Sequence, residues 1–142
     1  MIVKCIQQRP TEAEIEVLGE VYKQTGLKHD SHLTVGRSYL VFGIVMNTSY
    51  PNMGKGTWVS LLCDHGHLEE YPIALFEIID GRVDPEWIVK NRSDGLVLVQ
   101  PELLYGEYFS EHYTDRVPEA VKSFRELMKR MEQRSGLPVS HS

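Results

Sequence analysis

Short apolar runs separated by turn residues recur along most of the chain. The runs are rich in Val, Ile, Tyr and Phe, whereas the breaks between them carry Gly, Asn, Asp and Pro. Such a pattern is typical of consecutive antiparallel strands joined by short turns. It gives strand candidates at residues 2–6, 39–46, 58–63, 68–71, 74–79, 87–89 and 96–99.

Residues 12–25 show the three- and four-residue apolar spacing of an amphipathic helix. Thr11 and Glu14 stand just before and inside its first turn, at the spacing of a capping box, in which each side chain accepts a hydrogen bond from the other residue's backbone N–H. Gly26 is placed to end the helix in a left-handed conformation. The pattern therefore predicts one continuous N-terminal helix.

The clearest helical pattern lies near the C-terminal end. Apolar residues recur every three or four positions over residues 117–131 and form one face. Asp115 or a neighbouring residue is placed to cap this helix, with Pro118 in its first turn, and Gly136 is placed to end it. Before it, residues 101–113 predict a short helix followed by a turn.

Together these elements predict an α+β fold in a single domain. We expect a strongly twisted antiparallel sheet of five or six strands, either open or partly closed into an SH3-like barrel, with the N-terminal and C-terminal amphipathic helices packed against it. A chain of 142 residues is long enough for one hydrophobic core. The domain is expected to span residues 1–136, and residues 137–142 are expected to form a frayed tail.

The composition is that of an ordinary globular protein, with 42% apolar and 25% charged residues. No run of about 18 apolar residues occurs, which argues against a membrane span. The first ten residues lack the apolar core and cleavage site of a signal peptide, so a cytoplasmic location is expected. Cys5 and Cys63 are accordingly expected to be reduced and partly buried.

The net charge of −5 is unevenly distributed along the sequence. Residues 64–86 contain seven acids against one base, whereas residues 120–134 contain five bases against two acids. An acidic sheet region would repel phosphate, so the sequence argues against direct nucleic-acid binding there. The bases of the C-terminal helix are expected to form a solvated face.

A carboxylate and two imidazoles lie close together at the predicted turn between two strands. Asp64, His65 and His67 are ligand types that could hold one metal ion, with Cys63 or His29 completing the shell, and a small metal-dependent hydrolase is one function that fits them. The alternative is an exposed hairpin tip, because alternate residues of a tight turn need not point to one centre. We expect that alternative, and therefore neither a metal nor another cofactor.

An aromatic-rich segment follows the last strand candidate. Residues 105–113 contain Tyr105, Tyr108, Phe109 and Tyr113. Such residues are more often core than ligand platform, but a small-molecule or peptide-binding module could use them. The sequence has neither a Gly-x-Ser-x-Gly elbow nor a complete phosphate-binding loop. We therefore expect a binding protein rather than an enzyme.

Three segments, residues 34–44 (TVGRSYLVFGI), 71–81 (YPIALFEIIDG) and 85–87 (PEW), are similar to a group of short bacterial proteins. That group resembles the immunity proteins encoded beside polymorphic or contact-dependent-inhibition toxins, and the resemblance covers about residues 33–90. It implies a protein that neutralises the C-terminal domain of a cognate toxin by occluding its surface. Many such domains are basic nucleases, for which an acidic partner gains encounter rate and charge complementarity.

The surface expected to meet the toxin combines acids of the sheet region with neighbouring aromatic residues, a combination that protein-binding hot spots use. The resemblance itself assigns no functional residue, so this set comes from charge and position alone. Its members are Asp64, Glu69, Glu70, Tyr71, Glu77, Asp80, Asp84 and Trp87.

Overall fold

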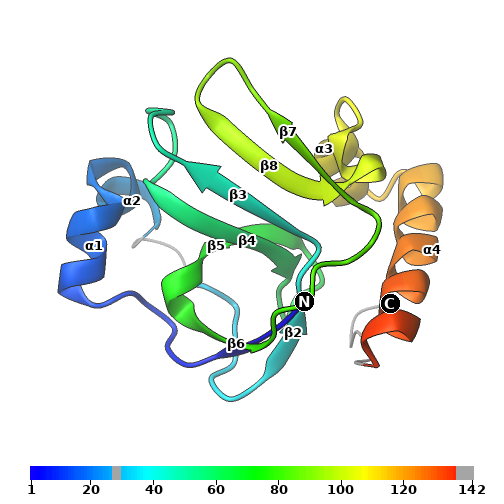
Figure 1. Cartoon of the computed structure of the whole chain (residues 1–142), viewed down its shortest axis with the longest axis horizontal. Helices are drawn as coiled ribbons and strands as arrows, with labels where there is room; N and C mark the ends of the chain where they lie inside the picture. The colour runs from blue at the N-terminus through cyan, green and yellow to red at the C-terminus, as the bar shows by residue number, and fades with distance from the viewer. Residues whose placement is uncertain (27–29, 137–142) are drawn as a thin grey trace.

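The computed structural model describes residues 1–26 and 30–136 and confirms the α+β class (Figure 1). Its strands are β1 (Ile2–Cys5), β2 (Ser38–Leu40), β3 (Gly43–Asn47), β4 (Gly56–Leu62), β5 (Leu68–Pro72), β6 (Phe76–Asp80), β7 (Trp87–Asn91) and β8 (Leu96–Pro101). Its helices are α1 (Glu12–Leu18), α2 (Glu20–Thr25), α3 (Phe109–Thr114) and α4 (Pro118–Ser135), with 3₁₀ turns η2 (Ile73–Leu75) and η3 (Glu102–Tyr105).

The strands form two antiparallel sheets in place of the single sheet of five or six strands that the sequence predicted. Their orders are β2-β1-β6 and β5-β4-β3-β8-β7. Residues 38–47 bend from the smaller sheet into the larger one, and residues 68–80 bend back. At the first bend, the Val41 N–H donates to the Met1 carbonyl and the Phe42 N–H donates to the Ser60 carbonyl, so adjacent residues already belong to different sheets. A continuous apolar run gives no sign of such a bend.

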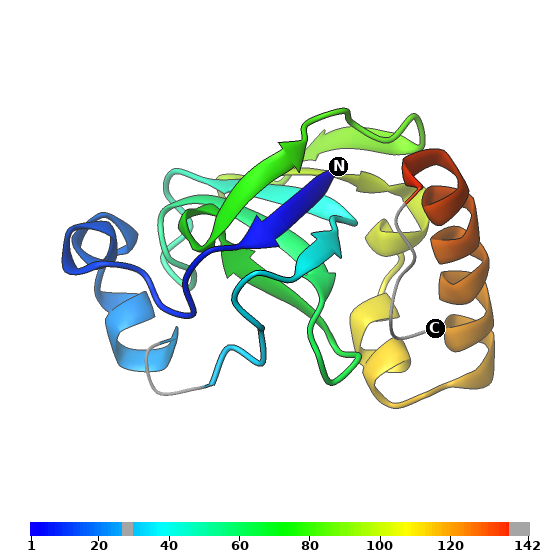
Figure 2. The same ribbon diagram turned by 90° about the horizontal axis from the view of Figure 1, so that it is seen from below.

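The space between the two sheets is filled by apolar side chains. Figure 2 shows the three-stranded sheet lying across the larger one. Val3, Val59 and Leu61 are fully buried between them. Cys5 and Cys63 lie in the same cluster as free, buried thiols. This core fixes the inner face of the five-stranded sheet.

Two helix pairs pack at opposite ends of the five-stranded sheet (Figures 1 and 2). Leu18 and Tyr22 of α1 and α2 pack on Trp58 at one end. Phe109 of α3 and Phe124 of α4 belong to a second cluster at the other end. No helix within residues 1–26 and 30–136 combines the length and the apolarity needed to cross a membrane.

The N-terminal helix is interrupted, contrary to the prediction of one helix over residues 12–25. The capping box is confirmed, since the Thr11 N–H donates to Glu14 Oε1 at 2.7 Å and the Glu14 N–H donates to Thr11 Oγ1 at 3.3 Å. Gly19 adopts φ +92°, which ends α1 and starts α2 in a new direction. Gly26 has ordinary right-handed geometry, so its predicted left-handed cap is wrong.

The C-terminal helix begins and ends near its predicted positions, but its cap differs. Val117 precedes Pro118 and provides no side-chain hydrogen bond, while Asp115 ends α3 instead. Gly136, with φ +75°, ends α4 as predicted. The short helix and turn predicted for residues 101–113 occur in a different form, as the turn η3 followed by α3.

Candidate functional site: a groove across the five-stranded sheet

A row of residues with a polar character crosses the outer face of the five-stranded sheet. The strand register places Glu70 opposite Ser60, and Ser60 opposite Gly43. Gln100 lies beside Gly43 on the next strand and pairs with Ile88 of the edge strand. The row therefore runs through β5, β4, β3, β8 and β7, and three of its five members carry polar side chains.

Gly43 allows the Gln100 side chain to lie against the sheet. A Cβ atom at position 43 would come within 2.8 Å of the Gln100 Cβ and 3.1 Å of the Val99 carbonyl oxygen. The Gln100 Oε1 atom would stand 3.3 Å from the same Cβ, so the amide lies over the middle strand. Only glycine fits this close approach without displacing β8.

The rows on either side of this polar row are apolar and covered by helices. On one side, Trp58 and Val45 pack with Leu18 of α1. On the other side, Phe42 and Leu62 pack with the residues of α3 and α4. The polar row between them stays open and forms the floor of a groove.

The groove has a volume of about 770 Å³ and is lined from β4, β5, β7, β8, η3 and α3. Leu98, Leu104 and Phe109 provide apolar lining, and Lys90 and Arg92 provide positive charge. A volume of this size lies within the range of roughly 300–1,000 Å³ that is usual for ligand sites. The groove is therefore large enough for a short peptide segment or a small molecule.

The polar side chains of the groove floor stand out because they lack a partner among residues 1–26 and 30–136. Among the residues that the structure describes, Ser60, Glu70 and Gln100 make no side-chain hydrogen bond or ion pair. Ser60 is nevertheless only 5% exposed. Glu70 is exposed, Gln100 is half-buried, and the Ser60 oxygen is not among the buried side-chain atoms that lack a partner in the described part of the chain. The three polar groups are therefore open to water and available to a ligand.

The Glu70 carboxyl is the chemically distinctive group of the groove. Its side chain is open to solvent, yet protein surrounds it in the recess, and this desolvation raises the pKa of Glu70 above its usual range. The nearby charge of Arg92 opposes the rise without cancelling it. Arg92 is itself paired with Asp94. Glu70 thus lacks a dedicated cation and would gain from a ligand that supplies one.

Tyr105 forms a rigid part of the groove wall. Its hydroxyl lies 2.5 Å from the Ile88 carbonyl oxygen and 2.8 Å from the Leu98 carbonyl oxygen, so its one proton is shared between two acceptors on adjacent strands. The Lys90 ammonium lies 4.5 Å from the centre of the Tyr105 ring. Burial raises the pKa of Tyr105, and the phenol therefore stays protonated as a donor. These contacts fix η3 on the β7–β8 hairpin.

Two acids of the predicted toxin-binding surface are already engaged in the fold. Asp64 accepts hydrogen bonds from the Thr34 hydroxyl at 2.6 Å, from Arg37 at 2.8 Å and from the Tyr39 hydroxyl at 2.7 Å. Asp80 is paired with Arg82 at 2.6 Å, and this guanidinium holds the pKa of Asp80 well below its usual range. Both carboxylates hold loops in place rather than present free charge.

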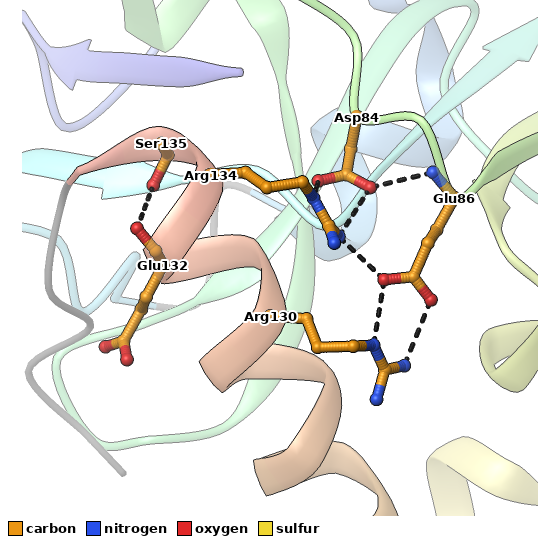
Figure 3. Close-up of polar contacts among 6 residues, drawn as sticks. All are labelled: Asp84, Glu86, Arg130, Glu132, Arg134 and Ser135. Carbon is orange, nitrogen blue, oxygen red and sulfur yellow. Dashed lines mark hydrogen bonds and ion pairs between the residues drawn. The ribbon is translucent and has the colours of Figure 1, made fainter.

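The acidic segment after β6 and the basic end of α4 neutralise each other (Figure 3). Arg134 donates to Asp84 at 2.9 and 3.0 Å and to Glu86 at 2.6 Å. Arg130 donates twice to Glu86, at 2.9 and 3.0 Å, and the two arginines lower the pKa of Glu86 to about 2. The Asp84 side chain is only 6% exposed, so it is not a surface acid, contrary to the prediction. Arg130 and Arg134, two of the five bases of the C-terminal helix that were expected to form a solvated face, are thus paired with acids.

The five remaining members of the predicted surface are divided between the core between the sheets (Tyr71 and Trp87), the groove (Glu69 and Glu70) and the exposed strand β6 (Glu77). Tyr71 is buried in the core between the sheets, contrary to the prediction that it is a surface aromatic. Its hydroxyl lies 2.9 Å from Glu69 Oε2. Trp87 packs against the same core, and its buried Nε1 has no hydrogen-bond partner in the described part of the chain. Glu77 is exposed on β6, and Glu70 lies in the groove.

The predicted metal ligands Asp64, His65 and His67 are not brought to one centre. Asp64 is held by the three donors described above, and the His65 ring packs on that of His32 with 4.1 Å between ring centres. His29 lies outside the described residues. The structure instead groups a different set of ligand atoms within 4.8 Å of one another, in Cys63, His67 and Glu69.

The aromatic segment contributes to the groove, but not as a whole. Tyr105 and Phe109 line the groove, Tyr113 is buried in the cluster with Phe124, and Tyr108 is exposed. Ser60 and Gln100 were not among the predicted site residues. The one signal available was a polar residue inside or at the end of an otherwise apolar strand, in the runs WVSLLC and LVLVQ.

Comparisons with protein-family models, curated proteins and solved structures give no match to this chain. The resemblance to immunity proteins therefore receives neither support nor contradiction from them.

Proposed function

We propose that this protein binds an extended, positively charged segment of a partner protein in the sheet groove, and that it blocks the partner's action by occupying that segment. The observation that carries the proposal is the row of unpaired polar side chains, Ser60, Glu70 and Gln100, on the floor of an open groove. A bound segment would take the place of water as the hydrogen-bond partner of these groups.

The shape of the groove suits a stretch of polypeptide. Its floor presents a carboxylate, a hydroxyl and an amide in one line, so acceptors for backbone and side-chain N–H groups follow one another across the sheet. Tyr105 and Phe109 stand beside this line and offer aromatic surface. Aromatic contacts around a desolvated polar centre are typical of the residues that dominate binding energy at protein interfaces.

A cationic group of the ligand fits over Glu70, because the two bases of the groove, Lys90 and Arg92, are already paired with Glu102 and Asp94. A Lys or Arg side chain placed there would stabilise the ionised carboxylate, whose pKa the groove raises. The net charge of −5 adds a long-range attraction to a basic partner. Both the Glu70 carboxylate and the negative net charge predict faster association and tighter binding of a basic partner at low ionic strength.

The most specific form of the proposal is that the partner is the C-terminal domain of a cognate bacterial toxin, as the sequence resemblance implies. Neutralisation by occlusion requires a rigid surface that is already formed before the encounter. The groove meets this requirement, since its floor is a five-stranded sheet held on both faces by apolar clusters.

Replacing Glu70 with glutamine is expected to weaken binding of the toxin domain about 10- to 100-fold, because it removes a charge-assisted hydrogen bond worth roughly 1.5–3 kcal/mol. The measurement is titration calorimetry of the purified chain with the C-terminal domain of the toxin encoded beside it. The wild-type affinity is expected to fall as the pH is lowered through the raised pKa of Glu70, since protonation removes the carboxylate. The E70Q variant is expected to lack this pH dependence.

Glu77→Gln is the matched control, because Glu77 is an exposed strand acid outside the groove. Both variants remove one negative charge, so a general effect of net charge would weaken both equally. Binding that is lost in E70Q and kept in E77Q supports the groove. Equal losses would contradict it and would return the interaction to a diffuse acidic surface.

A further inference from the structure

The hairpin formed by β4 and β5 brings three metal-ligand atoms together just beyond its last ladder pair. The Cys63 N–H donates to the His67 carbonyl at 3.0 Å, so these two residues lie directly opposite one another. Leu61 pairs with Glu69, two residues further along, which puts Glu69 on the same face as His67. The ligand atoms of Cys63, His67 and Glu69 consequently lie within 4.8 Å of one another.

The three donors suit a transition metal of intermediate softness. A thiolate, an imidazole and a carboxylate are the ligand types that Zn²⁺ accepts in protein sites. Zinc bonds of about 2.0–2.3 Å place the donor atoms of a tetrahedral site roughly 3.3–3.6 Å apart. The His67 side chain is exposed and makes no hydrogen bond, ion pair or ring contact with another described residue. A rotation of this side chain can therefore bring its nitrogen closer to the other two ligand atoms.

The carboxylate of this group is already oriented by a neighbour. The Tyr71 hydroxyl lies 2.9 Å from Glu69 Oε2 and 2.7 Å from the Ser31 carbonyl oxygen. The Tyr71 hydroxyl has one proton, which the Glu69 and Ser31 oxygens share. A ligand carboxylate held by a donor from the surrounding protein is a regular feature of zinc sites.

We propose that Cys63, His67 and Glu69 form a binding site for Zn²⁺ at the end of the β4–β5 hairpin. Cys63 is fully buried and provides the inner ligand, whereas His67 approaches from solvent. Three protein ligands leave the fourth tetrahedral position open to water or to a donor from another molecule. Binding replaces the Cys63 thiol proton with the metal and releases that proton to solvent. This inference does not depend on the proposed groove function.

The test is a titration of the reduced full-length chain with Co²⁺, followed by displacement with Zn²⁺. The absorption spectrum of bound Co²⁺ depends on its ligands and geometry. A bound thiolate gives a charge-transfer band in the near ultraviolet, and tetrahedral geometry gives intense visible bands. The wild-type chain is expected to bind one equivalent with both signals. His67→Gln is expected to lower the affinity at least about tenfold, the lower bound for loss of even an outer-shell partner.

Two control variants separate this site from its neighbours. His65→Gln changes an adjacent histidine that packs on His32, and Cys5→Ser removes the other cysteine of the chain; both are expected to bind like the wild type. Cys63→Ser is expected to abolish the charge-transfer band, with circular dichroism to check its fold. If the Cys63→Ser variant does not fold, the test rests on H67Q, because residue 67 is exposed and its replacement should leave the fold intact. Absence of binding by the wild-type chain, or binding lost in H65Q and kept in H67Q, would overturn the proposal.

Discussion

Replacing Phe124 with alanine is expected to lower the free energy of unfolding by about 3–5 kcal/mol. Phe124 is fully buried at the centre of the cluster under α4. Its ring centre lies 4.7 Å from that of Tyr113, 4.9 Å from that of Phe42 and 6.1 Å from that of Phe109. Truncation therefore removes contacts with three aromatic rings at once and leaves a cavity that the rigid sheet cannot fill. Urea denaturation at neutral pH measures the change.

Arg125→Ala is the control for this variant, since Arg125 is the next residue of α4 and is exposed. Its truncation is expected to change the free energy of unfolding by less than about 0.5 kcal/mol. A loss below about 1 kcal/mol for F124A would contradict the view that α4 is an integral wall of the fold. In that case α4 would be a loosely attached element.

Replacing Arg134 with methionine is expected to lower the free energy of unfolding by about 2–3 kcal/mol. Asp84 would keep its charge in a site that is only 6% exposed, and it would lose both hydrogen bonds that neutralise it. Removing one partner of a fully buried ion pair typically costs 3–5 kcal/mol, and the 34% exposure of Arg134 reduces that figure. Thermal unfolding at neutral pH, with R125M as a control of equal chemistry, measures the effect.

The same network shapes the stability of the protein in acid. The pKa of Glu86 is about 2 in the folded chain, below the ordinary value of 4.5, so its ion pairs stabilise the fold above pH 4.5. This contribution is lost as the pH falls from about 4.5 through about 2. The loss is expected to be shallower in R134M, because Arg134 is one of the two cations that lower this pKa. If R134M and the wild type lost stability in the same way between pH 4.5 and about 2, the Glu86 ion pairs would not be the cause of the loss.

The sequence predicted elements defined by local signals and failed where distant segments meet. The Thr11–Glu14 capping box and the Gly136 cap each depend on residues close in sequence, and both are confirmed. The break at Gly19 was missed because glycine is tolerated within an apolar helical pattern. The bend at Val41 and Phe42 was missed because both residues are buried, in a run that reads as one strand.

The candidate site shows the same limit. Glu70 was selected from its charge, but its partners in the row, Ser60 and Gln100, are distant in sequence and meet it only through the strand register. The uneven charge along the chain was visible in the sequence. The sequence did not reveal that Arg134 neutralises Asp84, which lies 50 residues away. Likewise, the turn histidines suggested a metal site, but strand pairing selects Glu69 over Asp64 as the carboxylate near His67.

Site-specific photo-crosslinking tests the central claim, that the groove is the surface that captures the partner. A photoreactive residue is placed at Ser110, an exposed position on the rim of the groove, and in a second chain at Glu77 on β6. Each purified chain is irradiated with the proposed partner, the C-terminal domain of the cognate toxin, and the joined peptides are identified by mass spectrometry. The account predicts crosslinks from position 110 to a Lys- or Arg-containing segment, and none from position 77. Crosslinks from position 77 with none from position 110 would contradict it.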